Sequence, residues 1–80
     1  MNLYAVYDKA AELYTGLIED QNDATAIRSF LHACQDPQTS LAIKPSDYAL
    51  YCLGTYDRST GIVSSCEPRK VQDGRRMDDA

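Results

Sequence analysis

The feature that most constrains the fold is a tyrosine-rich apolar run at residues 48–56, which is followed by a shorter apolar return at residues 61–65. Aromatic, β-branched and leucine side chains suit a pleated, partly buried surface, so both segments are predicted to be strands. The residues between them begin with Asp57 and end with Gly61. An Asp side chain accepts hydrogen bonds from nearby backbone, and glycine takes a positive φ, so this connection predicts a β-hairpin with a longer loop.

A single helix is predicted at about residues 23–35. The side chains of Asn22 and Asp23 suit the free N–H groups of a first helical turn, and Pro37 disfavours helix in the residue before it. The apolar residues that follow recur at i, i+3, i+4 and i+7, which is one face of a helix. These residues are Ile27, Phe30, Leu31 and Cys34, and Ala24 extends their stripe backwards.

The N-terminal part is predicted to contribute further strands. Residues 3–7 form a short β-type run, and residues 12–18 are interpreted as a second strand with a bulge at Gly16. One helical turn at residues 10–12 is the alternative. The sequence therefore predicts an α+β fold: a small antiparallel sheet in the order ββαββ or βαββ, with one amphipathic helix packed on one face.

The C-terminal part lacks this pattern. Proline cannot donate to a sheet ladder, so Pro68 is predicted to end the last strand. Residues 69–80 have little apolar content. We therefore predict a single domain at residues 1–68 and a polar, mobile tail at residues 69–80.

Length and charge limit the function. A chain of 80 residues has one small core and little room for a deep enzyme pocket. Residues 1–66 carry four basic and eight acidic side chains, so an acidic body is expected to repel nucleic-acid phosphates. No apolar run is long enough to span a bilayer, and no signal peptide is expected. Three cysteines, an odd number with no close pairing motif, favour a reducing compartment.

The best candidate for a functional surface is the side of the sheet that one helix cannot cover. Tyr48 and Tyr51 are predicted to point to opposite faces, so some tyrosines must lie on the uncovered face. That face is interpreted as a dimer or partner interface, as a platform that stacks bases of single-stranded DNA, or as partly buried core. The candidate contact residues in the strands and the tail are Tyr48, Tyr51, Tyr56, Arg69, Lys70, Arg75 and Arg76.

Catalytic, cofactor and metal sites are not predicted. His32 and Cys34 are two residues apart on one helix, so their side chains diverge, and Cys52 or Cys66 would have to approach through the fold. Structural zinc requires paired ligands two to four residues apart, which these cysteines do not provide. Gly54 and Gly61 are isolated and form no phosphate-binding loop. The protein is therefore expected to be non-enzymatic.

Three segments in register resemble one family. Residues 45–57 with Thr60 and Gly61, the opening at residues 3–10 and the helix start at residues 22–30 are similar to the small nonstructural protein of gokushoviruses, which are single-stranded-DNA phages of the microvirus family. The likeness covers about residues 2–71.

The resemblance implies a protein of the host bacterial cytoplasm that is absent from the virion. It implies a role in viral single-stranded DNA synthesis or genome packaging, exerted by binding a viral or host replication or packaging protein, with DNA as a further partner. A second copy of the chain is also an expected partner, because pairing through a sheet edge or face suits so small a domain. Arg28 matches the family and should project from the polar helix face, which makes it a candidate contact. The alternative for Arg28 is an ion pair with Asp20 or Asp23.

Overall fold

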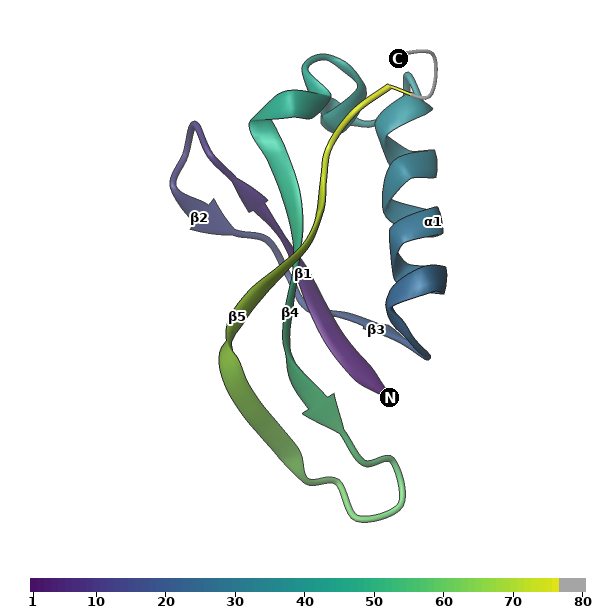
Figure 1. The fold of residues 1–80 in the computed structure, drawn as a ribbon, viewed down its shortest axis with the longest axis vertical. Helices are drawn as coiled ribbons and strands as arrows, with labels where there is room; N and C mark the ends of the chain where they lie inside the picture. Colours follow the sequence, from purple (N-terminus) through teal and green to yellow (C-terminus); the bar gives the residue numbers. More distant parts are fainter. Residues whose placement is uncertain (77–80) are drawn as a thin grey trace.

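The computed structural model describes residues 1–76 and shows a helix packed against one face of an antiparallel sheet (Figure 1). The elements, in chain order, are β1 (Asn2–Asp8), β2 (Leu13–Tyr14), β3 (Ile18–Asp20), α1 (Asp23–Gln35), the 3₁₀ helices η1 (Ser40–Ala42) and η2 (Pro45–Asp47), β4 (Tyr48–Tyr56) and β5 (Val63–Asp73). This arrangement confirms the predicted α+β class, and the order is ββαββ with the second strand in two pieces.

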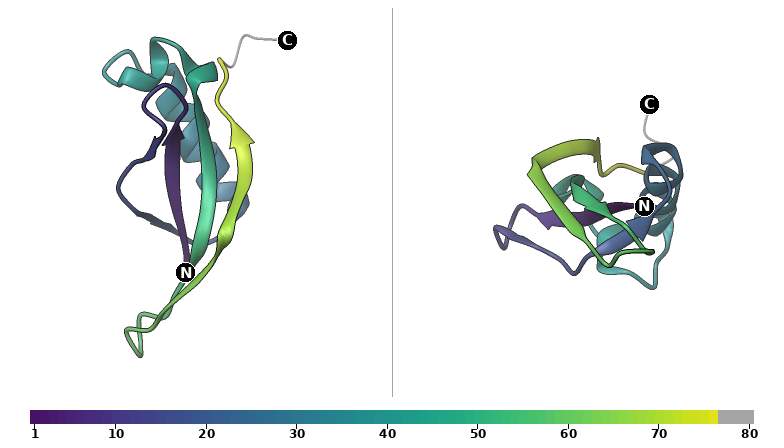
Figure 2. Two further views of the ribbon diagram at one scale, coloured as in Figure 1. Left: turned by 90° about the vertical axis from the view of Figure 1, so that its left-hand side faces the viewer. Right: turned by 90° about the horizontal axis from the view of Figure 1, so that it is seen from below.

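The sheet is organised around β1 and β4. Neighbouring strands follow the order β2–β1–β4–β5, β3 also pairs with β1, and every pairing is antiparallel. The predicted strand at residues 12–18 is divided into β2 and β3, because residues 15–17, which include Gly16, lie in neither strand, and β3 extends beyond the prediction to Asp20. Residues 9–12 form a turn instead of helix. Figure 2 (left) shows β1, β4 and β5 side by side with α1 behind them. We call the sheet face away from α1 the open face.

Local signals define α1. The Asn22 side chain accepts a hydrogen bond from the Thr25 N–H at 2.9 Å, which satisfies one of the free donors of the first turn. The helix ends at Gln35, and Asp36 is already extended, as expected for a residue that precedes a proline. The predicted bounds of the helix are confirmed.

The core lies between α1 and the sheet. Phe30, Leu31 and Cys34 of the predicted stripe are buried against Tyr4 and Leu50. The stripe continues backwards through Ile27, which is partly buried, and Ala26, which is buried. Ala24 is exposed, so its assignment to the stripe is wrong. Position 26 lies closer than position 24 to the direction of position 30, since four residues are about one helical turn.

The predicted hairpin between β4 and β5 is confirmed. The Asp57 carboxylate accepts hydrogen bonds from the Ser59 N–H at 2.9 Å and from the Ser59 hydroxyl at 2.7 Å. Gly61 has a φ of 76°, and its N–H donates to the Asp57 carbonyl while the Asp57 N–H donates to the Ile62 carbonyl. This geometry is a glycine bulge that closes the turn, and only glycine takes that φ without strain.

The last strand is longer than predicted. β5 continues to Asp73, so the predicted end at Pro68 is wrong. Residues 66–68 lie in an irregular stretch between Ser65, which pairs with Gly54, and Arg69, which pairs with Cys52. A proline is tolerated there because the strand is at the sheet edge and the ladder is interrupted. The predicted boundary at residue 68 thus falls inside a strand, and residues 77–80 of the predicted tail lie outside the described residues.

A register irregularity in β4, opposite that stretch, decides which way Tyr56 faces. Tyr48 packs against the core on the α1 side, and Tyr51 faces the other way, as predicted. The register then shifts at Leu53, and Gly54 pairs with Leu3, whose neighbour Tyr4 faces α1. Gly54 and, two residues later, Tyr56 therefore lie on the open face together with Tyr51.

A buried phenol connects three elements. The Tyr4 hydroxyl accepts a hydrogen bond from the Asn2 amide at 3.0 Å and donates one to the Asp23 carboxylate at 2.7 Å. Arg69 of β5 binds the same carboxylate at 3.2 Å. Burial, and then the hydrogen bond to Asp23, raise the pKa of Tyr4 to about 12. These contacts attach the start of α1 to β1 and β5.

Candidate interaction surface on the open face

Three tyrosines from three strands meet on the open face. The ring centroids of Tyr7 and Tyr14 are 4.7 Å apart, those of Tyr14 and Tyr51 are 5.5 Å apart, and those of Tyr7 and Tyr51 are 5.9 Å apart. The rings are inclined to one another by 52° to 89°, the tilted and edge-to-face range that aromatic pairs favour. We call these three residues the tyrosine cluster.

Strand register explains why the rings meet. Tyr7 faces Tyr14 across β1 and β2, and it faces Ala49 across β1 and β4. Tyr51 faces Ala5 across the same β1–β4 ladder. Both alanines are fully buried, and their small side chains leave room for the large rings diagonal to them. The result is an aromatic surface whose outermost ring, Tyr14, is 43% exposed.

The positive charges beside the tyrosine cluster are only partly neutralised. Lys70 pairs with Tyr51 across β4 and β5, so it lies on the open face. The Asp73 carboxylate lies 3.3 Å from the Lys70 ammonium and 3.9 Å from the Lys9 ammonium. Two cations therefore share one anion near the cluster, which leaves a single net positive charge. This composition suits contact with a protein better than contact with a phosphate backbone.

The structure distributes the predicted tyrosine contacts over two faces. Tyr51 belongs to the tyrosine cluster, and Tyr56 lies on the same face closer to the hairpin turn. Tyr48 lies on the α1 side against the core and does not join them. Sequence reasoning did not select Tyr7 and Tyr14. Their position on either side of a short polar turn was the available signal, because a tight hairpin places such residues opposite each other.

Arg28 is exposed on α1, on the other layer from the tyrosine cluster. Within residues 1–76 it makes no ion pair, so the predicted pairing with Asp20 or Asp23 is wrong. Both acids have other partners: the Thr25 hydroxyl donates to Asp20, and Arg69 binds Asp23. Arg69 thus faces α1 and not the open face.

The predicted basic tail does not lie beside the tyrosines. The Gly74 N–H donates to the Tyr48 carbonyl at 2.8 Å, which turns the chain toward the end of α1. There the Gln35 amide donates to the Arg75 carbonyl at 2.9 Å. The Arg76 guanidinium donates to the carbonyl of Ala42 at 3.0 Å. Among the predicted basic contacts, Lys70 is the one whose register puts it on the open face.

The titratable and thiol groups are dispersed. His32 and Cys66 are exposed, whereas Cys34 and Cys52 are buried, and burial raises the pKa of the Cys34 thiol. Residues 1–76 contain no group of three side chains that could together hold a metal ion. Over the same residues, α1 is neither long nor apolar enough for a membrane span.

Comparison with known proteins identifies a family. A family model described as Phage ORF5 protein matches residues 1–77, which is nearly the whole chain. No curated protein and no solved structure gives a significant match.

Proposed function

We propose that this small phage accessory protein, which belongs to the Phage ORF5 protein family, acts by binding another protein and is not an enzyme. The observation that carries the proposal is the tyrosine cluster. Aromatic side chains that are grouped, partly exposed and held by packing are typical of the centre of protein interfaces. Phenol hydroxyls at such a surface are able to form hydrogen bonds to a partner.

The proposal also concerns the step of infection at which the protein acts. The resemblance to the gokushovirus nonstructural protein supports a role in viral single-stranded DNA synthesis or genome packaging, in the cytoplasm of the host bacterium and outside the virion. The partner would be a viral or host replication or packaging protein. A second copy of the chain is an additional partner, since small domains often form symmetric dimers.

The test is capture of the partner by the purified protein from lysates of infected bacteria. We expect Tyr14→Ala to reduce the captured amount at least about fivefold, because an interface aromatic typically contributes more than 1 kcal/mol. Ile43→Ala is the matched control, because Ile43 is 80% exposed and lies away from the open face. Equal capture by Tyr14→Ala and the wild type would refute the role of the cluster.

Binding of single-stranded DNA is the second candidate. The observation in its favour is Lys70, which lies opposite Tyr51 and places a cation beside a ring that is able to stack on a base. The test is a fluorescence titration with labelled single-stranded DNA at two salt concentrations. Tight binding that weakens steeply with salt and with Lys70→Ala, but not with Lys44→Ala, would favour DNA over a protein partner.

A further inference from the structure

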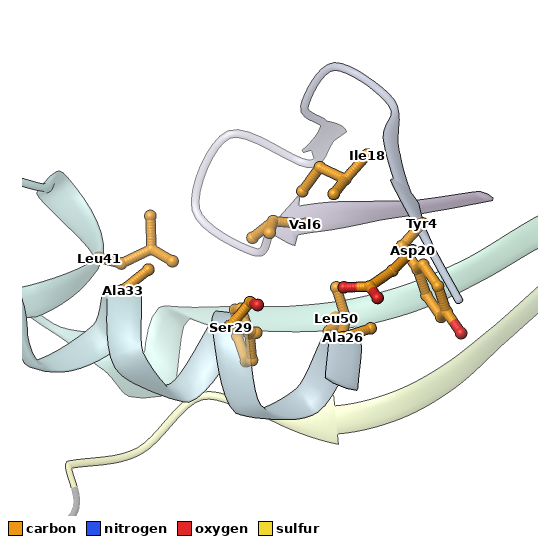
Figure 3. Close-up of a pocket in the computed structure, with 10 residues that line it drawn as sticks. Tyr4, Val6, Ile18, Asp20, Ala26, Ser29, Ala33, Leu41 and Leu50 are labelled. Atoms are coloured by element: carbon orange, nitrogen blue, oxygen red, sulfur yellow. The ribbon is translucent and has the colours of Figure 1, made fainter. Parts of the chain in front are cut away.

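A second surface lies on the other side of the sheet. A cavity of about 120 Å³ opens between α1 and β3, with β1 and β4 as its floor (Figure 3). Its lining is almost entirely apolar. Its floor includes Tyr4, Val6 and Leu50, and its walls include Ile18, Asp20 and Phe30.

The cavity exists because two elements are small at this point. Strand β3 has three residues and covers only one end of β1. The helix presents Ala26, Ser29 and Ala33 on this side, so short side chains face the gap. An engineered apolar cavity of about 150 Å³ accepts benzene. This cavity is somewhat smaller but is open at its mouth, so it has room for the apolar end of a single side chain.

The mouth of the cavity is apolar as well. Ile18 forms part of its wall and is still 44% exposed. An aliphatic side chain that remains exposed at the edge of an apolar cavity is characteristic of a docking site.

The charge around the mouth selects the partner. Residues 10–27 contain the acids Glu12, Glu19, Asp20 and Asp23 and no basic residue, so this segment accounts for the whole net charge of −4. Arg58 pairs with Glu19, and Arg69 pairs with Asp23. Asp20, which lines the cavity, receives hydrogen bonds only from the neutral Thr25 hydroxyl and the Gln21 N–H among residues 1–76. Within the described residues it therefore has no cationic partner.

We propose that this cavity binds a bulky apolar side chain of a partner protein segment, with lysine or arginine flanking that side chain. The apolar group fills the cavity, and the flanking cation approaches Asp20. The inference rests on the proposed role in protein binding, but it concerns the α1 side of the sheet, whereas the tyrosine cluster lies on the open face. The two surfaces are therefore separable by experiment.

The test is a titration of isotope-labelled protein, followed by amide chemical shifts, with a synthetic peptide that carries leucine and phenylalanine between two pairs of lysines. We expect the largest shifts at Val6, Ile18, Ser29 and Ala33. A peptide with serine in place of both apolar residues should bind at least about tenfold more weakly, and one with glutamate in place of the lysines should also bind more weakly.

Two variants locate the site. Ala33→Leu fills the cavity from the helix and should weaken peptide binding about tenfold, whereas Ala24→Leu makes the same change at an exposed position of α1 and should not. Asp20→Asn keeps an acceptor for Thr25 and should weaken binding about threefold. Shifts confined to the tyrosine cluster, or equal binding by Ala33→Leu and wild type, would overturn the proposal while leaving the role of the cluster intact.

Discussion

Tyr4 shows how much a single buried phenol contributes to this fold. It is fully buried, and its hydroxyl donates to a carboxylate that Arg69 also binds. We expect Tyr4→Phe to lower the free energy of unfolding at pH 7 by about 1.5–3 kcal/mol, the usual contribution of a hydrogen bond to a charged group. Urea denaturation measures this, and Tyr14→Phe is the control because the Tyr14 ring is partly exposed.

The same residue predicts an alkaline transition. Its pKa in the folded state is about 12 against an ordinary value of 10.0. A group with a raised pKa stabilises the fold fully below its unfolded pKa, and that stability is lost as the pH rises to the folded value. Stability should therefore fall between about pH 10 and about pH 12, and the fall should be smaller in Tyr4→Phe. Identical pH profiles for variant and wild type would contradict this assignment.

Gly54 lies at a position where a side chain cannot be added without moving the backbone. A Cβ there would lie 2.1 Å from the Ser64 carbonyl oxygen, and the φ of 153° is one that other residues rarely adopt. We expect Gly54→Ala to cost about 2–4 kcal/mol, because the β4–β5 ladder has to move. Gly16→Ala is the matched control, since a Cβ at that position would meet no atom within 4 Å beyond its chain neighbours, and its effect should be below about 1 kcal/mol.

At the scale of elements, the sequence is informative where local chemistry decides the structure. The cap at Asn22 and the periodic apolar residues were enough to predict α1 with its observed bounds, and the Asp57 and Gly61 turn was enough for the hairpin. The extension of β5 was not predictable in this way. Whether Pro68 ends a strand depends on its being at the sheet edge, opposite an irregular β4, and neither fact is local.

The candidate site also depends on features that are not local in the sequence. Which tyrosines share a face follows from the register shift at Leu53 and from the turn that brings Tyr14 against Tyr7. A period-two count along β4 puts Tyr51 and Tyr56 on opposite faces, and the shift reverses that assignment. The cavity was also beyond sequence reasoning, because it results from the shortness of β3 beside small helix residues.

The length of β5 leads to a truncation test. Residues 69–73 pair with β4, and Val71 packs against the core. A chain that ends at residue 68 loses this pairing and the Arg69 contact to Asp23, so we expect it to lose cooperative unfolding in urea. A chain that ends at residue 76 should keep its cooperative unfolding in urea. If residues 1–68 unfolded with the same midpoint as the full chain, β5 would contribute no stability beyond Pro68.

At the scale of the whole molecule, ion pairs join distant segments of an acidic chain. Arg58 of the hairpin turn binds Glu19 of β3, and Arg69 of β5 binds Asp23 at the start of α1. The hydrogen bond from Arg58 lowers the pKa of Glu19, and those from Tyr4 and then Arg69 lower the pKa of Asp23. Acids with lowered pKa values stabilise the fold above their unfolded pKa values, and this stability is lost as the pH falls through the folded values.

This linkage predicts acid sensitivity below the ordinary pKa values, which are 4.5 for Glu19 and 3.8 for Asp23. The urea midpoint should be steady above about pH 5 and should fall as the pH is lowered toward about 2. The double variant Glu19→Gln, Asp23→Asn should show a flatter decline, because these two acids no longer take up protons on unfolding. Glu12→Gln, an exposed acid without an ion pair in residues 1–76, should keep the wild-type slope. An unchanged slope in the double variant would mean that other carboxylates control acid unfolding and that these two pairs only position β5 and the hairpin turn.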